Sequence, residues 1–324
     1  MDKKFHTNLI VSSAPHIVTD ADTTRLMGSV LLALLPALIA STYIFGIRVL
    51  LLSIVCMVAC VALEYFYNAI THKRQTIGDL SAALTGLLLA FNLPCNFPIW
   101  KAIVGCAFAI LVVKNLYGGL GKNFVNPAIA GRIFLFISFA SNMSTWPTTR
   151  LDTTDAVTGA TPLAIFGETG ATDQFSLGQL FLGFHGGAMG EVCALALLIG
   201  GLYLIIRKVI SPIIPCAFIG TVFVIGLIAS GNLHDALFQV LTGGVMLGAI
   251  FMATDYVTSP KLPLGQLIFG IGCGLLTMAI RLLGSYPEGV SFSILVMNLC
   301  SPLLNRLSFK VYCKDALNKF GGGK

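Results

Sequence analysis

Long apolar runs, separated by short polar or glycine-containing breaks, make up most of the chain. The runs are continuous rather than alternating, which favours helices over half-buried strands. A helix needs about 20 apolar residues to cross the hydrocarbon core of a membrane. We therefore predict an all-α, multi-pass membrane protein with about ten transmembrane helices. The predicted segments are 26–45, 49–70, 80–93, 100–116, 124–139, 191–206, 212–229, 236–253, 264–283 and 290–304.

Two of these segments are short or interrupted. The third ends in Asn92-Leu93-Pro94, and the sixth follows a broken apolar stretch, 177–184, and then His185-Gly186-Gly187. Interrupted helices occur at membrane depth where protein or a cavity satisfies the free backbone groups. We expect discontinuous helices in both places.

Composition supports a membrane protein. Of 324 residues, 56% are hydrophobic and only 10% are charged, whereas a soluble domain carries about 25% charged residues. The mean hydropathy is +0.87. This excludes an ordinary soluble enzyme and a disordered protein. The net charge is +6, but no basic run with interleaved aromatics predicts a nucleic-acid partner; the lipid bilayer is the expected environment.

The positions of Lys and Arg predict the topology. With the N-terminus in the cytoplasm, every Lys and Arg falls on the cytoplasmic side except Arg48, Lys101, Arg150 and Arg281. Such a bias is typical of cytoplasmic loops, and it places both termini inside. The predicted organisation is a cytoplasmic N-terminal segment (1–25), a first five-helix half (26–139), an external loop with a broken helix (140–190), a second five-helix half (191–304) and a cytoplasmic tail (305–324).

A short internal match suggests that the two halves are related. Leu84-Thr85-Gly86 lies in the third segment and Leu241-Thr242-Gly243 in the eighth. Because the two segments are five spans apart, related halves would have opposite orientations. Inverted repeats are common in transport folds. Two inverted five-helix repeats are one interpretation of this short match; the other is coincidence.

The external loop contains the candidate chemistry, in the sequence DAVTGATPL from Asp155 to Leu163. Gly159 leaves the backbone accessible, and Pro162 favours an extended Thr161, which would point its side chain away from any helix. A threonine hydroxyl without a neighbouring base is a poor nucleophile, but it is a plausible acceptor for a modifying enzyme. Composition alone favours an exposed turn of small residues.

Thr158-Gly159-Ala160-Thr161, with Asp155 upstream, resembles a known flavinylation motif. This motif occurs in the D subunit of the Rnf electron-transport complexes and in the related B subunit of the sodium-translocating NADH:quinone oxidoreductases. The similarity extends to SSAPH at 12–16 and GGLGKNFVNPA at 118–128. The chain departs from the longer form of the motif at Ala164, where Ser or Thr is usual. Its short N-terminal segment favours the Rnf family.

This resemblance implies a function and a cofactor. FMN would be joined by a phosphoester to Thr161, with Thr158, Gly159, Ala160 and Asp155 as motif context, and a flavin transferase would make the bond. The chain would carry electrons as one part of a complex, without a complete active site of its own. The complex would couple electron transfer between ferredoxin and NAD to Na⁺ or H⁺ movement in the bacterial inner membrane. The implied partners are the A, B, C, E and G subunits of the Rnf complex, and the flavin loop would be periplasmic.

Several other features have two interpretations. The segment 118–128 is either a tight turn that starts a helix or part of a site for a second, non-covalent flavin such as riboflavin, or a quinone. Asp155 either holds the transferase's metal or orients the loop, or it is simply a turn residue. Cys56 and Cys60 lie one helical turn apart, which suits either apolar packing or a metal. Ionisable residues in membrane segments are functional candidates, but Glu64, Glu191 and Asp255 lie close enough to an interface to be hydrated.

A membrane transporter or channel without a redox cofactor is the alternative function. Ten spans and an inverted repeat fit it equally well, because fold alone does not determine function. The discriminating feature is the motif that ends at Thr161.

Overall fold

The computed structural model describes residues 22–73, 75–147, 149, 158–169, 175–284 and 288–320. These ranges are almost entirely helical, and one short antiparallel pair, β1 with β2, is their only sheet. The elements of the first half are α1 (Thr23–Phe45), α2 (Ile47–Ile70), η1 (Ile77–Asp79), α3 (Ser81–Phe91), α4 (Ile99–Ala107), η2 (Phe108–Asn115) and α5 (Pro127–Ser138). The connecting region contains α6 (Ala140–Met143), β1 (Trp146–Pro147), β2 (Thr158–Gly159), α7 (Pro162–Thr169) and α8 (Leu177–Leu182). The second half contains α9 (Ala194–Ile206), α10 (Ile213–Ser230), α11 (Leu233–Leu241), α12 (Val245–Leu247), η3 (Gly248–Met252), α13 (Pro263–Leu283) and α14 (Val290–Phe320).

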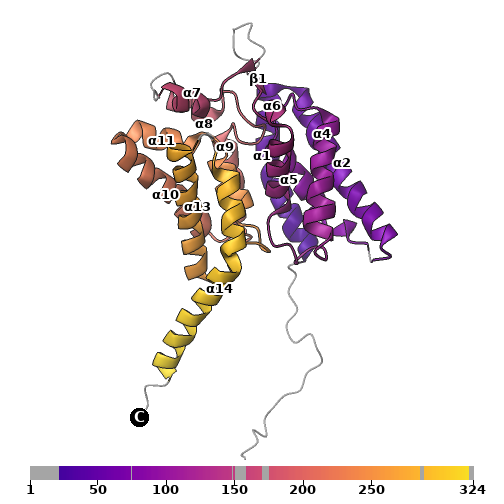
Figure 1. Ribbon diagram of the computed structural model, residues 1–324, viewed down its shortest axis with the longest axis vertical. Coiled ribbons are helices and arrows are strands. Elements are labelled where there is room, and N and C mark those ends of the chain that lie inside the picture. The colour runs from indigo at the N-terminus through magenta and orange to yellow at the C-terminus, as the bar shows by residue number, and fades with distance from the viewer. Residues whose placement is uncertain are drawn as a thin grey trace, which may run out of the picture.

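The two halves form two groups of helices that lie side by side (Figure 1). In the first half, α2 packs against α3 and α4, and in the second half α10 packs against α11 and α13. The halves meet where α1 packs on α9 and α5 on α14. The connecting elements α6, α7, α8 and β1 cover one end of the bundle, at the top of Figure 1.

Every predicted apolar segment coincides with helical structure. Within the described ranges, five helices are long and apolar enough to cross a membrane individually: α1, α2, α10, α13 and α14. A sixth span arises if α11 and the α12–η3 helix, bent by 64° at their junction, are counted together. The helices α3, α5 and α9 are apolar but shorter. The structure therefore supports a multi-pass membrane protein, while the count of ten spans stays a prediction.

Glycines allow the halves to approach closely. A Cβ added to Gly200 of α9 would lie 2.1 Å from the carbonyl oxygen of Ala33 in α1. Small residues permit such contacts between membrane helices. The extended segments beside α3 and α9 also join, because Gly190 N–H donates to the carbonyl of Phe91 at 2.9 Å. These contacts make the junction of the halves part of the buried core.

The last helix is longer than predicted. α14 continues to Phe320, past the expected end of the span at 304, so the predicted tail begins as helix. At about 1.5 Å per residue, its 31 residues exceed what a membrane span needs. Figure 1 shows α14 extending beyond the other helices.

Candidate functional site

Thr161 lies at the start of a helix. Pro162 is the first residue of α7, and the Ala164 N–H donates to Thr161 Oγ1 at 3.2 Å. The Ile165 N–H donates to the Thr161 carbonyl at 3.0 Å. A threonine N-cap followed by proline is a favoured helix start. The expectation that the side chain points away from any helix is therefore wrong: its hydroxyl caps one, and Thr161 is only 5% exposed.

The rest of the motif approaches α7 through a short strand. β2 pairs with β1, so that Trp146 lies opposite Gly159. Gly159 and Ala160 are exposed. The structure includes the backbone of Thr158 in β2, whereas Asp155 lies outside the described residues. The pairing brings a tryptophan from the first half of the loop next to the motif.

An open cavity lies beside Thr161, which we call the Thr161 cavity. Its volume is about 430 Å³, which lies within the range of cofactor pockets. Aromatic side chains from three separate elements contribute to its wall. Its lining residues are Arg132, Ile133, Phe136, Ala140, Met143, Ser144, Trp146, Ala160, Thr161, Ala164, Glu288, Ser291 and Phe292.

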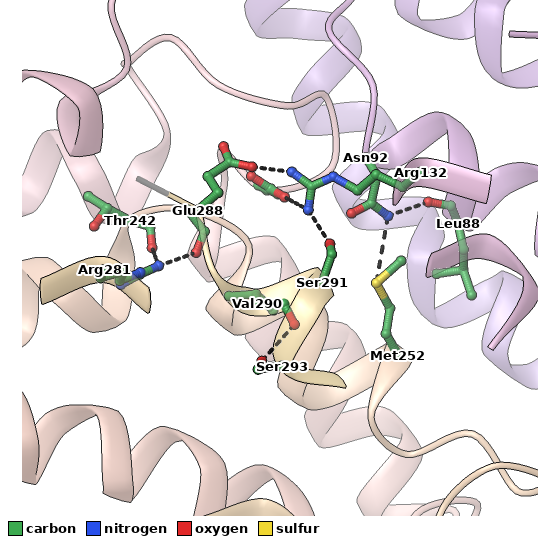
Figure 2. Close-up of polar contacts among 12 residues, drawn as sticks. Leu88, Asn92, Arg132, Thr242, Met252, Arg281, Glu288, Val290, Ser291 and Ser293 are labelled. Atoms are coloured by element: carbon green, nitrogen blue, oxygen red, sulfur yellow. Dashed lines mark hydrogen bonds and ion pairs between the residues drawn. The ribbon is translucent and has the colours of Figure 1, made fainter. Parts of the chain in front are cut away.

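A buried arginine and two glutamates meet at this cavity. Arg132 of α5 pairs with Glu288 and donates to Ser291 of α14, and its Nη1 lies 3.7 Å from Glu191 Oε1. Figure 2 shows Arg132 directed from α5 toward Glu288 and Ser291. Arg132 is 6% exposed and Glu191 is 7% exposed. Glu191 is thus not hydrated at an interface as expected; it is buried beside a cation.

A second arginine, half-buried, holds the break between α11 and α12. Arg281 donates to the carbonyls of Gln239 at 2.6 Å and Thr242 at 2.9 Å, and to that of Gly243 at 3.2 Å. The last carbonyls of a helix lack partners within it and attract cations. Arg281 therefore satisfies the end of α11, where the chain turns through Gly243 with a φ of +52°.

His185 lies on the other side of Thr161. It lines a small cavity shared with Thr161, Glu191 and Glu288. Its Nδ1 is 3.0 Å from the Gly186 carbonyl, and its Nε2 has no hydrogen-bond partner in the described structure. Burial lowers the pKa of His185, so the ring is neutral at pH 7, and Nδ1–H is then the donor to that carbonyl.

A separate ion pair lies near the opposite end of the first half. Lys114 Nζ is 2.8 Å from Glu64 Oε2 and donates to Ser81 Oγ at 2.8 Å. Thr76 donates to Glu64 Oε1 at 2.6 Å. The side chains of Lys114 and Glu64 are 1% and 2% exposed. The expectation of a hydrated Glu64 is wrong, because a lysine from another helix covers it.

The segment 118–128 starts α5 and also lines a cavity. Asn126 Oδ1 accepts from the Ala128 N–H at 3.0 Å, and Pro127 is the first helical residue. The turn interpretation is therefore confirmed. The same Asn126, with Lys114 and Ser81, borders a small cavity of about 70 Å³, which we call the Asn126 cavity. Asp255, in the turn after η3, lines it too. Burial raises the pKa of Asp255.

Cys56 and Cys60 are fully buried in α2. Cys106 of α4 donates weakly to the Cys56 carbonyl at 3.8 Å. Within the described ranges, no three His, Cys, Asp or Glu side chains are grouped in a way that suits a metal ion. The geometry therefore fits helix packing at these cysteines.

Comparison with known proteins decides the family. The model of the NQR2, RnfD, RnfE family matches residues 10–313. The chain belongs to the NQR2, RnfD, RnfE family.

Curated relatives support the same assignment, and each is the D subunit of its complex. The chain is 48% identical to that of the Na⁺-translocating ferredoxin:NAD⁺ oxidoreductase complex of Acetobacterium woodii, over 93% of this chain and 94% of the relative. It is 41% identical to that of the proton-translocating ferredoxin:NAD⁺ oxidoreductase complex of Clostridium ljungdahlii, over 92% and 94%. It is 36% identical to that of the ion-translocating oxidoreductase complex of Shewanella amazonensis, over 91% and 95%. The resemblance to the D subunit of Rnf complexes is confirmed.

Arg132 and Glu288, which lie beside Thr161, were not predicted as site residues from the sequence. Arg132 was counted among the cytoplasmic basic residues, and Glu288 was not singled out. The available signal was an arginine inside an apolar helix, because ionisable residues in membrane segments usually have a partner and a function. The partners themselves come from another helix and are not visible in local sequence.

Proposed function

We propose that this chain is a membrane flavoprotein subunit that carries electrons through FMN joined to Thr161, within a complex that couples electron transfer between ferredoxin and NAD to Na⁺ or H⁺ movement. The observation that carries the proposal is the position of Thr161. Its hydroxyl caps α7 and borders a cavity large enough for a cofactor. The names of the relatives support the redox reaction.

The residues around Thr161 fit a flavin and its phosphate. A helix N-terminus favours an anion, because free N–H groups and the helix dipole point toward it. Phe136, Trp146 and Phe292 supply aromatic surface for a flat ring, and Arg132 supplies positive charge. Bound FMN would supply reversible uptake of two electrons and their release one at a time.

Attachment would exchange the Thr161 hydroxyl proton for the FMN phosphoryl group of FAD, with AMP as the leaving group. A flavin transferase with a divalent metal would catalyse this step. The four motif residues, with Asp155, would be its recognition sequence. The A, B, C, E and G subunits would complete the complex in the inner membrane, with Thr161 on the periplasmic side.

Covalent fluorescence tests the proposal. The native protein, made with the transferase present, should fluoresce on a denaturing gel, and Thr161→Ala should abolish the band without reducing the amount inserted in the membrane. Thr145→Ala is a matched control, because Thr145 is an exposed threonine of the same connecting region. Absence of the band from the native protein would instead favour a transporter without a redox cofactor. A band that survives Thr161→Ala would remove the assigned anchor.

The Asn126 cavity is the proposed place of a second, non-covalent flavin such as riboflavin, and its volume of about 70 Å³ means that the surrounding segments would have to move apart to admit the ring. Its support is the combination of amide, hydroxyl and ammonium groups from Asn126, Ser81 and Lys114 around one empty space. Thr161→Ala protein should still release flavin when it is denatured, and adding Asn126→Ala should reduce that release. Protein without any releasable flavin would contradict this second site.

We also propose that the two halves are inverted repeats of one five-helix unit. In each half, a left-handed residue precedes the helix of the third span: Leu80 (φ 59°) before α3 and Gly243 (φ 52°) before α12. In each half, a cation of the fourth span contacts this break, since Lys114 donates to Ser81 and Arg281 to Gly243. These similar features support a common five-helix unit, although the two breaks do not fall at matching positions of the Leu-Thr-Gly alignment. A membrane-impermeant thiol reagent tests the implied topology, because it should label Gly159→Cys only from the periplasmic side.

A further inference from the structure

A phosphate attached to Thr161 would meet no unpaired positive charge among the described residues that line the Thr161 cavity. Among the residues that line the cavity, Arg132 carries the only positive charge and Glu288 the only negative charge. Arg132 is already paired with Glu288 and lies 3.7 Å from Glu191. A phosphodiester on Thr161 adds one negative charge beside two carboxylates. Buried charges are costly unless they are paired.

We propose that Arg132 is the phosphate-positioning residue of the site: it binds the phosphate carried by Thr161, and Glu288 gives up part of its contact with the guanidinium. The inference rests on the proposed function. It assigns to a membrane-embedded arginine the recognition of the phosphate, separately from the recognition of the flavin ring.

The surroundings of Arg132 suit an exchange of anions. Its guanidinium is held in place by Ser291, and it belongs to the middle of α5, where it is almost fully buried. Glu288 precedes α14, outside any helix, and its side chain is 19% exposed. Glu288 can therefore be rehydrated at little cost, whereas Arg132 keeps its position. Arginine presents several donors in a planar fork, which suits two anions at once.

Arg132 and Arg281 differ in the groups that they contact. Arg281 is half-buried, but it donates to main-chain carbonyls at the end of α11 and does not line the Thr161 cavity. It stabilises the broken helix rather than a ligand. Arg281 is consequently the matched control for Arg132.

The test separates phosphate binding from ring binding. Trp146 lines the cavity, and the chain has only one other tryptophan, Trp100. In Thr161→Ala/Trp100→Phe protein, purified and freed of flavin, quenching of Trp146 fluorescence would report binding at this cavity. FMN and riboflavin differ only in the phosphate, so the ratio of their dissociation constants measures its contribution.

Arg132→Gln should weaken FMN binding by about tenfold or more, as expected for a lost charged hydrogen bond, and leave riboflavin binding unchanged. Arg132→Lys should recover part of the difference, and Arg281→Gln should leave the ratio unaltered. The double variant Arg132→Gln/Glu288→Gln removes both members of the ion pair, so that neither charge is left unpaired to disturb folding. It should bind FMN and riboflavin with similar constants. Equal weakening of both flavins by Arg132→Gln, or no quenching of Trp146 by either, would overturn the inference.

A second readout uses the covalently loaded protein. Positive charge near a flavin favours electron uptake, so Arg132→Gln should shift its midpoint potential to a more negative value and Glu288→Gln to a more positive one. Failure of this inference is distinguishable from failure of the proposed function. An unchanged potential with flavin attached to Thr161 contradicts only the role of Arg132, whereas native protein without attached flavin contradicts the proposed function.

Discussion

Replacing Glu64 by Gln tests how much the stability of the protein depends on the buried Lys114–Glu64 ion pair. The substitution keeps the size of the side chain and an oxygen that can accept from Thr76, but removes the charge. Lys114 is 1% exposed, and its ammonium would retain Ser81 as its remaining partner among those the structure shows. Removing one member of a buried ion pair costs about 3–5 kcal/mol. We expect a loss of this size in the free energy of unfolding.

The double variant Glu64→Gln/Lys114→Met makes the prediction specific. Replacing a buried pair by groups of similar volume is often nearly neutral, so the double variant should be more stable than either single variant. Chemical unfolding in detergent, followed by circular dichroism, gives the four free energies of this cycle. Lys73→Met is the control, since Lys73 is an exposed lysine near the same end of α2. It should change stability little.

Additive effects would refute this reasoning. If the double variant loses as much stability as the two single variants together, Lys114 and Glu64 do not depend on each other in the folded protein. Small losses in both single variants would equally show that water reaches the pair, contrary to the burial in the structure.

Three further predictions concern other parts of the molecule. Gly200→Ala should lower stability because its Cβ would clash between α1 and α9, whereas Gly220→Ala, which has nothing within 4 Å, should not; thermal unfolding distinguishes them. Leu163→Ala should remove buried packing worth about 2–5 kcal/mol and, by loosening α7, raise the initial rate of flavin attachment to the buried Thr161. Because burial lowers the pKa of His185, the folded state should lose stability as pH falls below about 6.5, and His185→Gln should reduce that loss in unfolding curves at pH 5 and 7.

The helices could be predicted from the sequence because membrane burial imposes a local pattern. A run of apolar residues is visible without knowledge of its neighbours, and the helix start at Asn126-Pro127 follows from local capping chemistry. The start at Thr161-Pro162 obeys the same chemistry, but the sequence predicted an extended segment there. The family motif identified Thr161, and local chemistry explains why a helix begins there. These parts of the structure depend on residues that are close in the chain.

The buried charges could not be predicted in the same way. Lys114 and Arg132 fall inside the predicted spans 100–116 and 124–139, and the charge bias across the membrane assigned both to the cytoplasmic side. Their partners are distant in sequence, because Glu64 belongs to α2 and Glu288 lies just before α14. Only the packing of whole helices brings these charges together. Arg281 was counted as external for the same reason, although it is bonded to the end of α11.

The Thr161 cavity depends on contact between the two halves. Arg132 comes from α5 in the first half, whereas Ser291 comes from α14 in the second, and Thr161 reaches them from the connecting region. Neither half contains both the anchor threonine and the cation. Hydrogen bonds between the segments beside α3 and α9 hold the halves in register. A change that separates the halves would therefore move Arg132 away from Thr161, so the charge that the proposed flavin phosphate would meet depends on the packing of the whole bundle.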